Sequence, residues 1–295
     1  MKKIKHPKRV TAFADKTNNL YHVDPAYYKK LVRDNITSSY QLANGDTLET
    51  INKEASSIIA TNKIPGKIPK YETSDAFVTV KDHKNNFPRV VKCRLLNPSK
   101  THMGKLSKKL LQEVIASVKA NTNYIQWKNS AEVITWFDGI PKKKTKCFVC
   151  FDIVDYYPSI KQQQLLDAIN FAKQYTKLEK TDIEIILHSC KSILAYDKRM
   201  WRKKDPELFD VPMGSFHGAE VCDLVGLHLL SKLKGCFKNN SVGLYRDDGL
   251  AIIEQPRARS LDKLCKEVRS VMKQEGFDIT IEAGNITTDF LDVIS

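Results

Sequence analysis

Gly243-Leu-Tyr-Arg-Asp-Asp-Gly249 lies near the end of the chain and predicts a tight β-hairpin. Apolar runs of strand length flank it, Ser241–Tyr245 before and Leu250–Ile253 after. Asp and Gly are ordinary hairpin-turn residues, so one interpretation is a solvated turn. In the other, the adjacent Asp247 and Asp248 are held at a rigid strand end to bind a divalent metal. The choice depends on whether the rest of the chain supplies a matching carboxylate.

The run Cys147-Phe-Val-Cys-Phe-Asp-Ile-Val-Asp155 predicts a central strand buried on both faces, because it is almost continuously apolar. Asp152 interrupts the run, and a carboxylate in such a strand requires a partner or a metal. We expect Asp152 and Asp247 on adjacent strands, where two divalent cations would remove their mutual repulsion. Two metals about 4 Å apart activate a 3′-hydroxyl and stabilise a leaving pyrophosphate. Mg²⁺ suits such a site, with Mn²⁺ as an alternative.

The charge of the chain indicates a polyanionic partner. Its 295 residues carry 48 Lys and Arg against 34 Asp and Glu, a formal net charge of +14. Nucleic acid is the first expectation and an anionic membrane a poor second, although many basic proteins bind neither. Seven scattered cysteines favour a reducing compartment over a disulfide framework. No apolar run reaches the length of a bilayer span, so we expect an intracellular protein, cytoplasmic or nuclear and not secreted.

A basic hairpin is predicted from the strands Ala76–Val80 and Arg89–Leu96. Lys92 and Arg94 stand two apart, so their side chains leave the same face of the second strand. That face is suited to phosphates, which Arg binds by a bidentate fork and Lys as a point charge. An edge strand made basic to discourage aggregation explains the same residues equally well.

Apolar periodicity predicts helices over residues 24–35, 47–61, 105–120, 130–137, 160–175, 181–194, 216–237 and 256–274. We expect Asp24, Ser130 and Ser159 to cap the helices that they precede or begin. Residues 195–213 predict a looser hairpin, and Pro65–Pro69 predicts a linker. The helix over 216–237 carries a stripe of small residues at spacing four, Gly218, Cys222 and Gly226. Such a stripe admits a close neighbour, either a strand of the core or a stacked base pair.

Three stretches together resemble the reverse transcriptases of retroelements. Phe151-Asp-Ile-Val-Asp-Tyr-Tyr-Pro158 is similar to the first palm motif of that family, Met213-Gly-Ser-Phe-His-Gly-Ala219 to the second, and Tyr245-Arg-Asp-Asp248 to the third. Phe290-Leu-Asp-Val293 resembles the primer-grip region. The combination is similar to Penelope-like and related non-retroviral elements. The resemblance covers roughly residues 76–293.

The resemblance implies an α+β polymerase right-hand fold, in which an antiparallel palm sheet is backed by helices. The palm would comprise residues of about 146–159 and 211–295, and the fingers about 76–145 and 160–210. Residues 1–75 would form an N-terminal helical extension. Family members continue into a helical thumb, and we expect this chain to lack it or to carry it truncated.

Residue roles carry over from the motifs as expectations. Asp152 and Asp247 would be the principal metal ligands, and Asp248 the third catalytic carboxylate. The nucleotide would be bound by five residues: Lys81, Arg94, Tyr157, Gly214 and Gly218. The aromatic ring of Tyr157 would lie under the incoming sugar and clash with a 2′-hydroxyl. Tyr245 and Arg246 would contact the primer-template.

The implied activity is RNA-directed DNA synthesis, with an RNA template, a DNA or RNA primer and deoxynucleoside triphosphates as partners. Two alternatives stay open: a related palm polymerase that makes RNA, and a catalytically idle nucleic-acid-binding remnant. The chain departs from the family pattern at Met213, at Ala219-Glu220 and at Arg246, and none of these positions is a metal ligand. The charge of Arg246 is expected to lie near primer phosphate.

Overall fold

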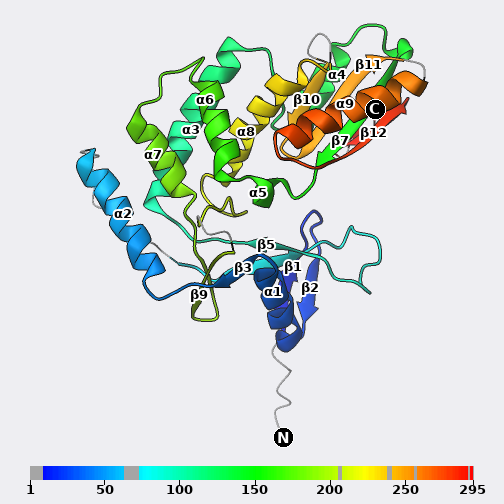
Figure 1. The fold of residues 1–295 in the computed structure, drawn as a ribbon. Coiled ribbons are helices and arrows are strands. Elements are labelled where there is room, and N and C mark those ends of the chain that lie inside the picture. Colours follow the sequence, from blue (N-terminus) through cyan, green and yellow to red (C-terminus); the bar gives the residue numbers. More distant parts are fainter. Residues whose placement is uncertain are drawn as a thin grey trace, which may run out of the picture. The chain divides into compact units, whose positions relative to one another are not determined.

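The computed structural model describes residues 9–62, 73–204, 208–237, 241–255, 258–291 and 293–294 (Figure 1). The predicted linker Pro65–Pro69 lies outside this part of the chain. Two compact units form: the first from Met1–Ser107 and Glu184–Gly218, the second from Lys108–Ile183 and Ala219–Ser295. The predicted mixed α+β class is confirmed. No helix among the described residues is long and apolar enough to cross a membrane.

The first unit contains three small sheets. One pairs β1 (Val10–Phe13) with β2 (Leu20–Val23), and another pairs β4 (Phe77–Val80) with β5 (Cys93–Leu96), both antiparallel. The third has the order β3 (Tyr40–Leu42), β9 (Arg199–Lys203), β8 (Leu194–Tyr196). Residues before position 76 therefore supply strands as well as helices, and they share a unit with later segments. The boundary predicted after residue 75 does not coincide with this division.

Two helices of the first unit follow their sequence signals closely. The carboxylate of Asp24 accepts hydrogen bonds from the N–H groups of Ala26 and Tyr27 and so caps α1 (Pro25–Ser39), as predicted. The helix α2 has the predicted bounds Thr47–Thr61. The core of the unit joins α1 to the strands through eight buried side chains: Val32, Ile36, Tyr40, Ala76, Val78, Leu194, Tyr196 and Trp201.

The second unit is built on a five-stranded sheet. Its order is β12 (Ile279–Asn285), β7 (Lys146–Ile153), β11 (Asp248–Glu254), β10 (Val242–Tyr245), β6 (Ile125–Gln126). Only the pair β10–β6 is parallel. The strand β7 lies between β12 and β11, which confirms the prediction of an internal strand.

Helices and apolar side chains cover both faces of this sheet. On one face, α4 (Ser130–Asp138) borders a cluster formed by Trp127, Val133, Phe148, Leu250, Ile252 and Phe290. On the other, α8 (Gly218–Leu233) approaches β10 so closely that a Cβ on Gly226 would lie 3.8 Å from Leu244 Cδ1. The helix α9 (Ala258–Gln274) packs beside β12 (Figure 1). The remaining helices are α3 (His102–Asn121), α5 (Tyr156–Ser159), α6 (Gln162–Ala172) and α7 (Lys180–Ser189).

Several predicted element ends are wrong. Asn129, and not Ser130, caps α4, because its side chain accepts from the Glu132 N–H at 3.0 Å. Ser159 closes the short helix α5, and α6 begins only after Lys161. The helix predicted over 181–194 stops at Ser189, since the apolar residues from Leu194 onward join a sheet. The predicted strand Arg89–Leu96 is reduced to Cys93–Leu96.

Candidate active site

The two acidic motifs meet at one end of the five-stranded sheet. In the register of β7 and β11, Asp152 lies directly opposite Asp248. Directly opposed residues of antiparallel strands point to the same face, with their Cα atoms about 4.5–5.5 Å apart. Asp152 is exposed and Asp248 is half-buried, so both are accessible from solvent. The predicted meeting of the two motifs on adjacent strands is therefore confirmed.

These two carboxylates belong to a row that crosses four strands. Thr280 of β12 pairs with Asp152, and Tyr245 of β10 pairs with Asp248. Tyr245 also packs against the apolar cluster of Phe148 and Leu250. The row thus lies where the apolar face of the sheet ends and the polar strand ends begin.

Asp247 occupies the turn and not a strand. The turn consists of Arg246 and Asp247, and Asp248 is already the first residue of β11. The Ile153 N–H donates to the Asp247 carbonyl at 2.9 Å, which fixes the turn beside the strand end that carries Asp152. We expected Asp247 on a strand adjacent to that of Asp152, but the strand residue opposite Asp152 is Asp248, and Asp247 lies one residue earlier, in the turn.

The environment predicted for Asp152 is wrong. We expected a carboxylate inside a strand buried on both faces, but Asp152 is exposed while its neighbours Phe151 and Ile153 are buried. Phe151 and Ile153 point to the opposite face of the sheet, where the core continues, and only the face that carries Asp152 is open at this position. The exposure of Asp152 removes the argument that burial alone demands a metal or a partner at this position.

Gly249 is needed for packing and not for the turn. A Cβ at this position would run into the Phe151 ring, since the two residues are opposed across β7 and β11. The ring therefore lies over the glycine, one position from the carboxylate pair. This contact explains why the second residue of β11 is a glycine.

Arg246 directs its side chain into the second unit. Its backbone is left-handed, with φ 55°. Its Nη1 donates to the Tyr157 hydroxyl at 3.2 Å and lies 3.5 Å from Asp223 Oδ1. Burial raises the pKa of the Tyr157 phenol, which is consequently neutral, and burial also raises that of the Asp223 carboxyl against the opposing charge of Arg246. Asp223 was not among the predicted site residues, although an acid that follows Cys222 on an apolar helix was a signal in the sequence.

The small residues of α8 admit side chains of the same unit. The Tyr156 hydroxyl donates to the Cys222 carbonyl at 2.7 Å. A Cβ on Gly226 would lie 3.0 Å from Gln126 Nε2 and 3.5 Å from the Tyr156 hydroxyl. At Cys222 and Gly226 the close neighbours are thus groups of the protein core, as the first of the two interpretations of the stripe predicts.

The carboxylates supply the oxygen ligands that Mg²⁺ prefers, but they do not form a complete set of protein ligands. In the part of the chain that the structure describes, no three His, Cys, Asp or Glu side chains come together as a ready-made metal group. Mg²⁺ commonly takes only one or two carboxylates, with water and substrate phosphate as its other ligands. Asp152 and Asp248 on one face, with Asp247 beside them, meet that smaller requirement. The residues present therefore fit the ion.

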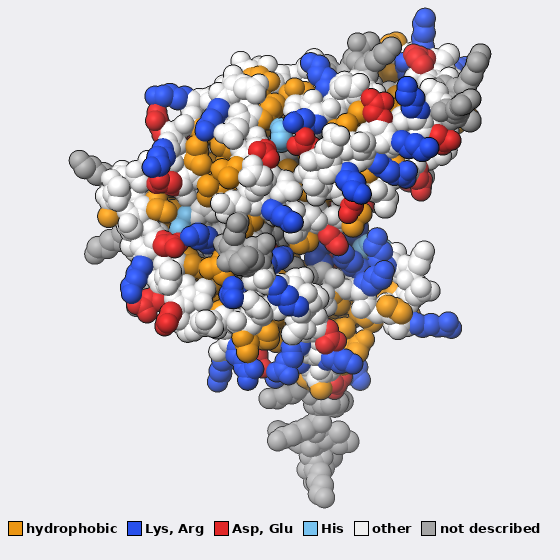
Figure 2. All heavy atoms as spheres, in the orientation of Figure 1, with side chains coloured by type: hydrophobic (Ala, Val, Ile, Leu, Met, Phe, Trp, Pro, Cys, Tyr) orange, Lys and Arg blue, Asp and Glu red, His pale blue; other side chains and the backbone are white. Residues whose placement is uncertain are grey.

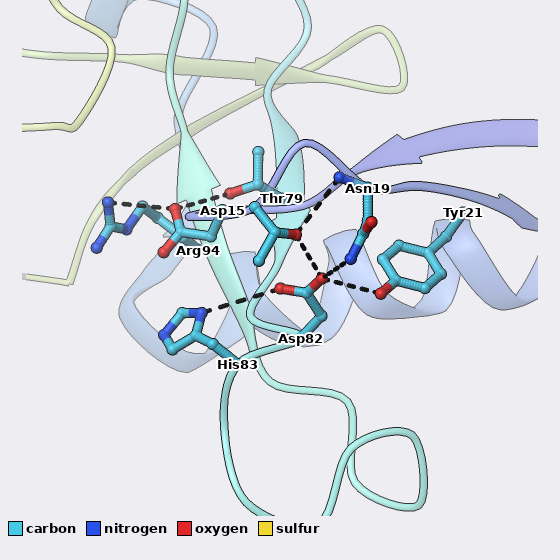
Figure 3. A network of polar contacts seen from close by, with 8 residues as sticks. Asp15, Asn19, Tyr21, Thr79, Asp82, His83 and Arg94 are labelled. Carbon is cyan, nitrogen blue, oxygen red and sulfur yellow. Dashed lines mark hydrogen bonds and ion pairs between the residues drawn. The ribbon is translucent and has the colours of Figure 1, made fainter. Parts of the chain in front are cut away.

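The predicted phosphate ligand Arg94 is engaged within the first unit (Figure 3). Its Nη1 lies 3.2 Å from Asp15 Oδ1, and Asp15 also accepts from the Thr79 hydroxyl at 3.3 Å. The Arg94 side chain keeps 31% of its surface exposed, whereas Asp15 keeps 4%. A phosphate at Arg94 would share the guanidinium with Asp15. The Lys81 N–H donates to the Lys92 carbonyl at 2.8 Å, which places Lys81 at the end of the same hairpin.

Asp82, next to Lys81, anchors this hairpin to the N-terminal one. Its Oδ2 accepts hydrogen bonds from the Thr17 hydroxyl at 2.6 Å, the Asn19 amide at 2.9 Å and the Tyr21 hydroxyl at 2.9 Å (Figure 3). These donors, Thr17 first and then Asn19, hold the pKa of Asp82 at about 2. The loop that begins at Lys81 is therefore fixed at its root.

The two glycines of the second motif are both held by turn geometry. Gly214 has φ 93°, and a Cβ there would lie 3.0 Å from the Asn97 carbonyl. The Asn97 N–H donates to the Met213 carbonyl at 2.8 Å, so this loop meets the end of β5, the strand that carries Arg94. The Gly218 N–H donates to the Ser215 hydroxyl at 3.1 Å at the start of α8. Gly214 is thus packed against Asn97, which directly follows β5 in the first unit.

The described cavities do not coincide with the carboxylates. A pocket of about 590 Å³ in the second unit is lined by α6 and α8 and contains none of the predicted site residues. Lys and Arg side chains are spread over the displayed face of the molecule, with Asp and Glu between them (Figure 2). The carboxylates of the candidate site lie at a strand end, where Asp152 is exposed and Asp248 half-buried.

Comparisons with known proteins address the fold. No protein-family model matches the chain, and no curated protein matches it. Among solved structures, apo telomerase from Candida tropicalis aligns with 98% of this chain and 56% of its own, at a TM-score of 0.64 and 10% identity. Telomerase from Candida albicans, in complex with a TWJ fragment of telomeric RNA, aligns with 96% of this chain and 50% of its own, at 0.60 and 10% identity. The chain has a reverse-transcriptase-like polymerase fold.

The likeness concerns architecture, because identities of 10% carry no residue roles. The chain spans 50–56% of the length of these two telomerases. A C-terminally truncated telomerase from Candida tropicalis matches over 93% of this chain, at a TM-score of 0.61. The Penelope-like origin stays a prediction from the motifs.

Proposed function

We propose that the chain is an RNA-directed DNA polymerase, which extends a primer 3′-hydroxyl with deoxynucleoside triphosphates. The observation that carries the proposal is the register of β7 and β11, which sets Asp152 opposite Asp248 with Asp247 in the adjoining turn. The polymerase-like fold supports it. In this assignment the second unit supplies most of the palm, and the residues assigned to the fingers are divided between the two units.

Asp152 and Asp247 would hold two Mg²⁺ ions, or Mn²⁺, with Asp248 as the third carboxylate. When bound, the ions would supply positive charge to the attacking 3′-hydroxyl and to the leaving pyrophosphate. The chain's own part is to hold the three carboxylates at a strand end and a hydrogen-bonded turn. This rigidity limits the reorganisation that the site must undergo during the reaction.

The remaining residues would orient the substrates. Lys81 and Arg94 would donate charge-assisted hydrogen bonds to the triphosphate, with Gly214 and Gly218 allowing close approach near the templating pair. The Tyr157 ring would lie under the incoming sugar, and Tyr245 would lie beside the primer end. The proposed template is RNA and the proposed primer is DNA or RNA. A net charge of +14 supports a nucleic-acid partner.

Primer extension on an RNA template tests this proposal. We expect Asp152→Asn and Asp247→Asn each to lower the extension rate by about 10³-fold or more, because each removes a charge that the metals require. Asp155→Asn is the matched control. Asp155 is an exposed carboxylate three positions on, in a left-handed conformation (φ 46°) that Asn tolerates well. Its variant should retain activity.

Extension that survives in both Asp152→Asn and Asp247→Asn would refute the assignment. The same assay, run with ribonucleotides, distinguishes the proposed function from the alternative of a palm polymerase that makes RNA. A preference of the unmodified protein for ribonucleotides would favour that alternative.

An idle nucleic-acid-binding remnant is the second candidate. It is favoured by the ion pair between Arg94 and Asp15, which occupies a proposed triphosphate ligand. It predicts tight, salt-sensitive RNA binding that is unaffected by Mg²⁺, without any extension.

A further inference from the structure

Three elements of the second unit meet at the side chain of Arg246. Tyr157 comes from α5, Asp223 from α8, and Arg246 from the turn that also contains Asp247. The guanidinium Nη1 lies 3.2 Å from the Tyr157 hydroxyl and 3.5 Å from Asp223 Oδ1. We call these three residues the arginine clamp.

The clamp is shielded from solvent more than an ordinary surface ion pair. The side chains of Arg246 and Asp223 keep 32% and 27% of their surface exposed. Water and salt weaken such a pair less than one on an open surface, because less of the field passes through solvent. Asp223 fixes the position of the guanidinium, and the guanidinium in turn holds the hydroxyl of Tyr157.

The backbone indicates that the Arg246 side chain has a role at this position. A left-handed φ of 55° favours glycine, and a side chain with a Cβ rarely adopts it. The turn nevertheless carries a long side chain, and that chain reaches two partners from different helices. Its contacts run toward Tyr157 and Asp223 of the same unit.

Different groups hold the backbone of Tyr157 and the hydroxyl end of its ring. Its neighbour Tyr156 is fully buried and donates to the Cys222 carbonyl, which anchors the backbone of α5. The tip of the Tyr157 ring is held by Arg246. Without that contact, the ring would keep only its edge contact with Tyr156 and a weak hydrogen bond between its hydroxyl and the Cys222 thiol, so its side-chain rotamer would be held less firmly.

We propose that Arg246 and Asp223 are positioning residues that hold the Tyr157 ring against the sugar of the incoming nucleotide and so set the rejection of ribonucleotides. This inference rests on the proposed polymerase function. A ring excludes a 2′-hydroxyl only if it cannot move aside, so the strength of exclusion depends on what holds the ring. Arg246 then acts on the nucleotide through Tyr157, and not on primer phosphate as the motif resemblance implies.

The test compares kcat/KM for a deoxynucleotide and for the matching ribonucleotide in single-nucleotide primer extension. We expect Arg246→Met and Asp223→Asn to lower the deoxy-to-ribo preference by about tenfold, chiefly by improving ribonucleotide use. Tyr157→Phe should do the same, because it keeps the ring and removes the hydroxyl. Combining Arg246→Met with Tyr157→Phe should add little to either change, since both break one contact.

Two controls separate positioning from charge and from folding. Lys128→Met removes an exposed cation of the same unit whose charge also acts on Asp223. Lys128 is not one of the three clamp residues, so this variant should leave the sugar preference unchanged. Primer affinity is measured alongside for each variant. A purely structural defect would slow both sugars together and leave their ratio intact.

A readout without turnover tests the clamp itself. In a double-mutant cycle on the unfolding equilibrium, Arg246→Met and Asp223→Asn should be coupled by a factor of about ten. The cycle of Arg246→Met with Tyr157→Phe should also be non-additive. Additive effects in both cycles would show that the contacts do not form and would overturn the inference.

The outcomes for the inference and for the proposed function differ. Extension by the unmodified protein with an unchanged sugar preference in all three clamp variants overturns the inference alone. A loss of primer affinity in Arg246→Met, without a change in sugar preference, assigns Arg246 to the primer and overturns it too. No extension by the unmodified protein with either sugar refutes the polymerase function, and with it the role of the clamp in sugar choice.

Discussion

His217 illustrates how strongly the first unit controls a single side chain. Its imidazole is buried, with Nε2 3.7 Å from the Cys190 thiol and no hydrogen-bond partner at Nδ1. Burial lowers the pKa of His217 to about 4. The neutral ring therefore belongs to the folded state, and protonation favours unfolding. The residue lies in the second motif, between Gly214 and Gly218, so its ionisation bears on that loop.

We predict that acid destabilises the protein through this ring. Because the folded pKa lies below the unfolded value near 6.5, the stabilisation is complete above pH 6.5 and is lost as pH falls toward 4. The free energy of unfolding should drop by about 2 kcal/mol between pH 7 and pH 5 from His217 alone. His217→Gln should reduce the drop, as urea denaturation at the two pH values would measure. The same substitution at exposed His22 should leave it unchanged, and an equal drop in all three proteins would contradict the prediction.

At the scale of single residues, the sequence predicted which residues form the candidate site better than it predicted their burial and their contact partners. The motifs of Asp152 and Asp247 could be placed on neighbouring strands because each follows an apolar run. The choice of Asp248 as the register partner of Asp152 depends on the length of the turn, which no spacing reveals. The pairing of Arg246 with Asp223 joins residues from a turn and a helix, and tertiary packing alone brings them together.

At the scale of elements, the contact between Phe151 and Gly249 holds the central strands of the second unit together. The ring occupies the space that a Cβ on Gly249 would need. A strand interior normally disfavours glycine, so this one is retained for close packing. The position directly precedes Leu250, whose side chain belongs to the apolar cluster on the opposite face.

We predict that Gly249→Ala lowers the free energy of unfolding by about 1–3 kcal/mol, because the added methyl group displaces a buried ring. Gly235→Ala is the control within the same unit, since the nearest atom to an added Cβ there is the Lys232 carbonyl at 4.0 Å. That substitution should be neutral or slightly stabilising. Urea unfolding followed by circular dichroism measures both, and equal stability of the two variants would contradict the packing role of Gly249.

Elements with one strong local signal were predicted best. The helix Thr47–Thr61 has an apolar stripe along its full length, and α1 begins at an Asp-Pro pair that both caps it and fits its first turn. The run from Ile193 to Tyr196 is short and apolar, which suits a buried helix end as well as a strand. The run forms a strand because it pairs with β9, and its own residues do not reveal that pairing.

At the scale of the whole molecule, the positive charge is the property that extends over both units. A surplus of 14 positive charges favours any polyanion, and the displayed face shows basic side chains spread widely instead of gathered in one patch (Figure 2). A distributed charge attracts nucleic acid without specifying its sequence. Specificity would have to come from the shape and the groups of the site.

We predict that RNA binding weakens steeply with salt. The affinity for a primer-template should fall at least tenfold, and up to about 10³-fold, between 50 and 200 mM monovalent salt, because binding releases condensed counterions. Fluorescence anisotropy of a labelled duplex over this range would measure the slope. An affinity that does not change with salt would contradict an electrostatic mode of binding.

The fit of Phe151 over Gly249 has a consequence for the alignment of the acidic strand ends. Sliding β11 by one residue along β7 would turn every side chain to the opposite face and would bring the aromatic ring against a residue with a side chain. The Phe151 ring therefore fits only in the register that places it opposite Gly249. Together with the length of the turn, an apolar contact away from the carboxylates thus favours the register in which Asp152 lies opposite Asp248.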